Sequence, residues 1–119
     1  MAQHNDLGKK GEEEAVKLLI NKGYKILRKN YRYLKHEVDV IAEYKNELIA
    51  VEVKTRSTAF FGTPQEFVKP AQIKSIVTAI NAFIEKEDIN LEVRFDVIAI
   101  IITDKKLEIT HIEDAFLSF

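Results

Sequence analysis

The chain has 119 residues, of which 46% are hydrophobic and 31% are charged, and its net charge is −1. This length predicts a single domain over residues 1–119, and the absence of cysteine excludes disulfides, thiolate zinc sites and thiol nucleophiles. No apolar run is long enough to span a bilayer and no signal-peptide pattern is present, so we expect a cytoplasmic protein with no membrane partner.

The charge is unevenly distributed along the chain. Residues 1–36 carry nine Lys and Arg against four acids, whereas the remainder carries nine against fifteen. A basic first third is typical of a surface that faces phosphates. Charges on solvated helix faces also cluster by chance, so the bias by itself leaves both interpretations open.

The first predicted element is a helix. Asn5 or Asp6 suits its N-cap, apolar residues at helical spacing continue to about Lys22, and Gly23 is a typical stop. Glu12 falls on the apolar stripe, where a carboxylate is unexpected unless it meets a partner. Glu12 is therefore either an additional acid for a metal site or an N-terminal acid favoured by the helix dipole.

Several strands are predicted next. Residues 24–28 predict a first strand, and residues 31–35 predict a second strand or an exposed connection. Two apolar runs at residues 37–41 and 48–54 then predict strands joined by a hairpin turn at residues 45–46.

Charged residues interrupt these last two strands. Alternate residues of a strand share a face, so Glu52 and Lys54 are neighbours, and the hairpin brings Asp39 opposite Glu52. A sheet interior is unfavourable for charge, and two converging acids suit a hard divalent cation such as Mg²⁺. A lysine beside them can neutralise charge on a phosphate, so the pattern suits phosphodiester hydrolysis.

The alternative for these charges is a solvated ion pair, which contributes at most about 1 kcal/mol. The neighbouring residues favour a buried site, because Leu48 and Ala50 precede Glu52 on its face and the opposite face is aliphatic. A strand that is apolar on both faces is usually covered on both sides.

A loop at residues 57–70 precedes a second helix, which begins near Pro70 and whose apolar stripe continues to Ile84. Strands are predicted at residues 93–102 and 107–112. This order of elements predicts an α/β domain whose central sheet is covered by helices on at least one face.

Several motifs together resemble the YraN-like family. They are Gly8-x-x-Gly11-Glu12, Glu37-Val38-Asp39-Val40-Ile41, Val51-Glu52-Val53-Lys54-Thr55-Arg56, Arg94-Phe95-Asp96-Val97 and His111-Ile112-Glu113-Asp114-Ala115-Phe116. The family is related to the restriction-endonuclease-like nucleases, notably the archaeal Holliday junction resolvases. The resemblance therefore implies a restriction-endonuclease-like fold, with a mixed central β-sheet flanked by α-helices.

The resemblance also implies roles for individual residues. Asp39, Glu52 and the backbone carbonyl of Val53 are the implied ligands of Mg²⁺ or Mn²⁺, Glu12 completes the acidic cluster, and Lys54 orients the attacking water. The predicted nucleic-acid contacts are Arg56, Gln72, Lys9, Lys10 and Arg32. For Arg56 and Gln72, a solvated surface position is the alternative.

These features predict a Mg²⁺-dependent DNA endonuclease or processing enzyme that acts on branched or otherwise structured DNA, as a homodimer like the resolvases. One alternative is a nucleic-acid-binding module that keeps the nuclease scaffold without turnover. Another is a protein-interaction module that docks through Phe60 and Phe61. Salt-dependent DNA binding without metal uptake favours the first alternative, and the absence of DNA binding favours the second.

Overall fold

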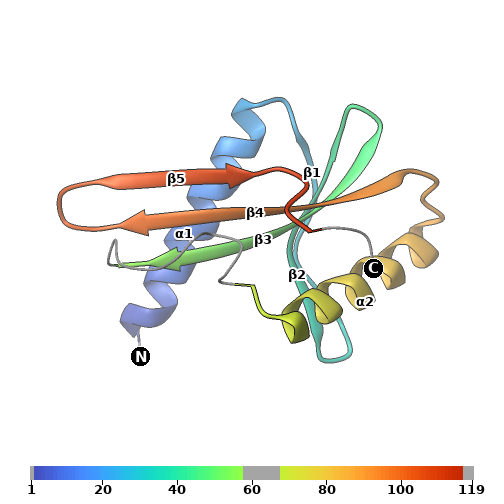
Figure 1. Ribbon diagram of the computed structural model, residues 1–119, viewed down its shortest axis with the longest axis horizontal. Coiled ribbons are helices and arrows are strands. Elements are labelled where there is room, and N and C mark those ends of the chain that lie inside the picture. Colours follow the sequence, from blue (N-terminus) through green and yellow to red (C-terminus); the bar gives the residue numbers. More distant parts are fainter. Residues whose placement is uncertain (1, 58–67, 117–119) are drawn as a thin grey trace.

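The computed structural model describes residues 2–57 and 68–116, and Figure 1 shows one sheet between two helices. The elements are α1 (Ala2–Asn21), β1 (Lys25–Tyr33), β2 (His36–Tyr44), β3 (Glu47–Arg56), α2 (Pro70–Glu87), β4 (Glu92–Ile102) and β5 (Leu107–Ile112). The five strands lie side by side in chain order. β3 and β4 are parallel, with α2 as their crossover, and all other neighbours are antiparallel.

This arrangement confirms the predicted α/β architecture, a mixed central sheet flanked by helices, and is consistent with a restriction-endonuclease-like fold. Neither described helix has the length and apolar character needed to cross a bilayer. Phe60 and Phe61 lie outside the described residues.

Each helix packs against one face of the sheet and buries its own core. On the α1 side, Leu19 packs with Val51 of β3, and on the α2 side, Phe83 packs with Ala50. Neighbouring residues of β3 therefore face opposite layers, as strand alternation requires. The central strand is covered on both faces, which confirms the expectation drawn from its apolar sequence.

Two elements differ from the sequence expectation. α1 begins at Ala2, so Asp6 lies inside the helix instead of at its N-cap, because Ala and Gln are good helix formers. β1 is one continuous strand where two segments were predicted, with a bulge between Ile26 and Arg28. Asn30 adopts φ 52° within it, and asparagine tolerates this left-handed region, so the polar stretch does not break the strand.

Two predicted turns are confirmed. Gly23 has φ 95°, and the N–H of Tyr24 donates to the carbonyl of Leu19 at 2.9 Å, which ends α1. Lys45 and Asn46 have φ values of 49° and 67°, which is typical of a two-residue hairpin of type I′.

A close contact positions α1 over the end of β3. Gly11 is buried, and a Cβ atom at this position would overlap the Thr55 hydroxyl. Only glycine lets the helix approach the strand this closely. Because Glu12 follows Gly11, this contact also fixes where the Glu12 side chain leaves the helix.

A buried ionic network lies on the α1 side of the sheet, opposite Glu52. Asp96 of β4 is fully buried, and it pairs with Arg94 at 2.8 Å and with His111 at 2.7 Å. The N–H of Asp114 also donates to it at 3.0 Å, and Arg94 donates to the Tyr24 hydroxyl at 2.6 Å. Burial alone would raise the pKa of Asp96, but hydrogen bonds from His111 and Arg94 outweigh it and hold the pKa below its usual range.

The Gly11 contact predicts opposite effects for two alanine substitutions in one helix. We expect Gly11→Ala to lower the free energy of unfolding by about 1–3 kcal/mol, because Thr55 blocks the added methyl group. Gly8→Ala meets nothing within 4 Å, so it should stabilise by about 0.5–1 kcal/mol. Urea denaturation measures both, and a stabilising Gly11→Ala would contradict the contact.

The buried network predicts that Asp96→Ala lowers the free energy of unfolding by about 3–5 kcal/mol, because Arg94 loses its shorter ion pair and keeps the longer one to Glu47 at 3.4 Å. The stabilisation is present above the ordinary pKa of Asp and is lost as the pH falls through the lowered folded value. Glu108→Ala removes an exposed ion pair with Lys106 and should cost less than about 0.5 kcal/mol. Equal losses in the two variants would refute this role.

Candidate functional site

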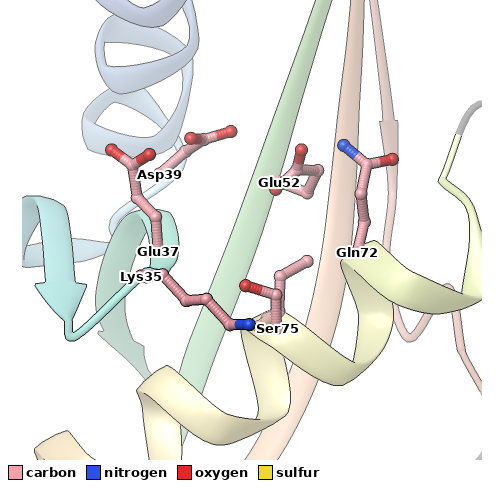
Figure 2. A pocket seen from close by; sticks show the side chains of 7 residues that line it. Lys35, Glu37, Asp39, Glu52, Gln72 and Ser75 are labelled. Carbon is pink, nitrogen blue, oxygen red and sulfur yellow. The ribbon is translucent and has the colours of Figure 1, made fainter.

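A polar pocket of about 210 Å³ opens between β2, β3 and the first turns of α2 (Figure 2). It is lined by Lys35, Glu37, Asp39, Glu52, Gln72, Ser75 and Ile76. The sequence predicted three of these residues, Asp39, Glu52 and Gln72, from two strands and one helix. Figure 2 shows how these elements bring residues from separate parts of the chain to one place.

Asp39 ends the ladder between β2 and β3. The paired residues run from the hairpin turn as far as Val40 and Val51. Beyond them, the N–H of Val53 donates to Asp39 Oδ2 at 2.8 Å. A side-chain oxygen therefore takes the place of a backbone carbonyl, and the two strands part beside the pocket.

Glu52 is a buried charge on the α2 side of the sheet. It is 9% exposed, and its Oε2 atom lies 3.4 Å from Nζ of Lys54, whose side chain is 16% exposed. A single partner offsets only part of the unfavourable desolvation of a buried carboxylate. This burial contradicts the alternative of a solvated surface ion pair.

Burial raises the pKa of both acids. For Asp39, burial has the largest effect and the charge of Glu52 the next largest, and they raise its pKa to about 8. Burial also raises the pKa of Glu52, against the opposing effects of Lys54 and of a hydrogen bond with Asp39. Both carboxyl groups are therefore poorly stabilised in the charged form, which is the condition that a bound cation relieves.

The backbone of Val53 adds a third oxygen to this region. The N–H and C=O of one strand residue point to the same side, so the Val53 carbonyl points toward the gap that Asp39 opens. Two carboxylates and a carbonyl are the hard oxygen ligands that Mg²⁺ and Mn²⁺ prefer. The donors at this site fit a divalent cation.

Glu12 approaches from the opposite layer. It is half-buried on α1. Burial raises the pKa of Glu12 above its ordinary value, and a hydrogen bond with Asn30 opposes this effect in part. The charge of Glu12 also raises the pKa of Asp39, but its effect is smaller than the effect of the Glu52 charge. Within residues 2–57 and 68–116, no group of three or more acids and histidines is arranged to hold a metal ion. The structure thus brings Asp39 and Glu52 together without Glu12, whose role as a ligand stays a prediction.

The predicted nucleic-acid contacts are spread over both sides of the sheet. Gln72 lines the pocket, Arg56 lines a neighbouring cavity with Glu12, and Lys9 lines a further cavity beside Glu12. Lys10 is exposed on α1, and the exposed Arg32 lies near the β1–β2 turn. These positions leave their contacts with nucleic acid as predictions.

Three polar residues of the pocket were not predicted. Glu37 raises the pKa of both Asp39 and Glu52, and its position two residues before Asp39 on one strand was the signal that could have identified it. Lys35 and Ser75 meet only because the β1–β2 turn packs beside α2, where His36 Nδ1 lies 3.1 Å from Ser75 Oγ. No local spacing in the sequence reveals that contact.

Comparison with known proteins matches the chain to a family. Residues 11–100 match the model of "Uncharacterised protein family UPF0102". The chain is 58% identical to a UPF0102 protein of Christiangramia forsetii and 51% identical to one of Flavobacterium psychrophilum, over the full length of both chains. It is also 46% identical to a UPF0102 protein of Phocaeicola vulgatus, covering 98% of this chain and 96% of the relative. The matches confirm the resemblance to the YraN-like family, and the names state no activity.

The raised pKa values predict that Asp39→Asn stabilises the metal-free protein. Because the folded pKa values of Asp39 and Glu52 are raised, the folded state binds extra protons, and stability falls as the pH rises toward 8. The amide oxygen of Asn can still accept from Val53 N–H, so we expect a gain of about 1–3 kcal/mol at pH 8. The gain should shrink at pH 5.

Thermal unfolding in EDTA at both pH values measures this effect. Asp104→Asn, at an exposed position between β4 and β5, is the matched control and should change the free energy of unfolding by less than about 0.5 kcal/mol. If Asp39→Asn were less stable than the wild type at pH 8, burial and the charge of Glu52 would not be unfavourable to the Asp39 carboxylate, and the interpretation would be wrong.

Proposed function

The chain belongs to the uncharacterised protein family UPF0102, the YraN-like family, and we propose that it is a Mg²⁺- or Mn²⁺-dependent endonuclease that hydrolyses phosphodiester bonds of DNA. The observation that carries the proposal is the buried Asp39–Glu52 pair beside Lys54, in which burial raises the pKa of both acids. Buried acids with raised pKa values in a pocket are typical of functional sites, because the fold stabilises them poorly until a ligand arrives.

Asp39, Glu52 and the carbonyl of Val53 are the residues that would hold the cation. A divalent metal bound there supplies neutralisation of phosphate charge and activation of a water molecule. The protein positions the ligands. The hydrogen bond from Val53 N–H orients the Asp39 carboxyl group, and the ion pair with Lys54 orients the Glu52 carboxyl group. Both ligands are therefore held in place before the substrate binds.

Lys54 has a second role in this proposal. Its ammonium group lies 3.4 Å from Glu52 and also lines the neighbouring cavity with Arg56. When the carboxylates hold a cation, the positive charge of Lys54 can face the phosphate, orient the attacking water and stabilise the charge that develops on the phosphate oxygens. Removing this charge should lower the rate of cleavage more than the affinity for DNA.

The basic side chains around the pocket suit the backbone of a nucleic acid. Lys35 lines the pocket itself beside the polar Gln72, Arg32 pairs with Glu37 of the pocket, Arg56 lines the cavity that Lys54 also lines, and Lys9 lies on the α1 side of the sheet. Contacts of this kind neutralise phosphates and make affinity fall with salt. We propose branched or structured DNA as the substrate, the cytoplasm as the compartment, and a homodimer as the assembly that cuts two strands.

The proposal predicts metal-dependent cleavage that requires both acids. Purified protein is incubated with four-way branched DNA or linear duplex and Mg²⁺ or Mn²⁺, and nicked products are resolved on denaturing gels. We expect Asp39→Asn and Glu52→Gln each to reduce cleavage by about 100-fold or more. Glu108→Gln removes the same charge from an exposed site on β5 and should cleave like the wild type.

Two results would contradict the proposal. Cleavage that survives both Asp39→Asn and Glu52→Gln would place the activity elsewhere or in a contaminant. DNA binding that falls with salt, but without cleavage or Mn²⁺ uptake, would instead identify the non-catalytic binding module.

A further inference from the structure

The turn between β1 and β2 carries an unusual residue. Leu34 is 78% exposed, and its backbone has φ 57°, in the left-handed region. A large aliphatic side chain is unfavourable in water, and a left-handed backbone is unfavourable for a residue with a Cβ atom. Glycine would avoid both penalties at this position.

The turn between β2 and β3 is also a two-residue hairpin, and it has polar residues at its left-handed positions. These residues are Lys45 and Asn46. Among the described residues, the other non-glycine positions with positive φ are all polar, so Leu34 is an exception. A residue kept in an unfavourable conformation points to a requirement that stability does not explain.

The surroundings of Leu34 are cationic and adjoin the candidate site. The next residue, Lys35, lines the pocket that contains Asp39 and Glu52. Arg32 precedes the turn with a side chain that is 70% exposed, and Tyr33 is 42% exposed. In Figure 1 the turn lies beside the first turns of α2, where His36 Nδ1 lies 3.1 Å from Ser75 Oγ.

We propose that Leu34 is a wedge that inserts between stacked bases of the DNA substrate while Arg32 and Lys35 hold the flanking phosphates. Apolar side chains that enter a base step unstack it and bend the duplex. Unstacking is least unfavourable where the stack is already interrupted, so the wedge would favour branched or mismatched DNA over regular duplex. This inference rests on the proposed function and assigns the recognition step of the same site to Leu34.

A nucleic acid fits this turn better than a protein partner does. Protein-binding patches usually cover several hundred Å² of contiguous apolar surface, about 300–600 Å² on a typical monomer. Here a single aliphatic side chain projects between cationic residues, with Lys74 and Lys35 lining a further cavity beside the turn. An exposed leucine beside an exposed tyrosine and several positive charges suits insertion between bases that are flanked by phosphates.

The test uses DNA duplexes that carry 2-aminopurine, whose fluorescence rises when the base is unstacked. One duplex is fully paired, and the other has a single mismatch beside the probe. Binding is measured in parallel by anisotropy, with EDTA present so that no cleavage occurs. We expect the wild-type protein to raise the fluorescence, with the larger increase on the mismatched duplex.

Leu34→Gly should abolish the fluorescence increase while weakening DNA binding by less than about tenfold, because the phosphate contacts remain. Leu34→Met keeps a long apolar side chain and should retain the increase. Asn46→Gly makes the corresponding change in the other hairpin and should behave like the wild type. Leu34→Gly should not lower Tm, because glycine adopts this backbone without strain.

An unchanged fluorescence increase in Leu34→Gly would overturn the wedge. If the wild type sediments as a dimer and Leu34→Gly as a monomer, and if the loss of DNA binding follows from that change, Leu34 would instead form a contact between two copies of the chain. Metal-dependent cleavage that is unaffected by Leu34→Gly would remove the wedge and leave the proposed nuclease intact. Leu34-dependent unstacking without any cleavage in Mg²⁺ would support the wedge and contradict the nuclease.

Discussion

The hydrogen bond from Val53 N–H to Asp39 is the constraint on which the candidate site depends. It replaces a backbone partner at the point where β2 and β3 part, and it holds the Asp39 carboxyl group in the same pocket as Glu52. The apolar layers on both faces keep water from stabilising these acids, so the pKa values of both are raised. A site of this kind is poorly stabilised when empty and is expected to gain stability from a bound cation.

The rest of the fold offsets this unfavourable pair and surrounds it. The Asp96 network on the opposite face of the sheet satisfies its buried charges through Arg94 and His111, so it contributes stability where the candidate site does not. Gly11 brings α1 against the end of β3, and the β1–β2 turn brings Lys35 and Leu34 to the pocket side. The residues that we propose as ligands and as DNA contacts thus come from different layers of the fold.

The sequence predicted the elements whose local signals are strong, and it missed what depends on packing. Alternation in β3 placed Glu52 and Lys54 on one face, and the hairpin at residues 45–46 placed Asp39 opposite them, so both the face and the register could be predicted. The role of Lys35 in the pocket could not, because it requires the β1–β2 turn to pack against α2. The Asp96 network likewise joins distant segments, and its residues appeared in the sequence only as a family motif.

The most direct test of a metal site between Asp39 and Glu52 is a crystal structure. Crystals are grown with Mn²⁺, and anomalous diffraction is recorded on both sides of the manganese absorption edge. The account predicts one strong anomalous peak between Asp39 and Glu52, with carboxylate oxygens at about 2.0–2.3 Å. It also predicts that the carboxyl–carboxyl hydrogen bond is lost in that crystal. An anomalous map with no peak there, together with acids that remain hydrogen-bonded to each other at saturating Mn²⁺, would contradict it.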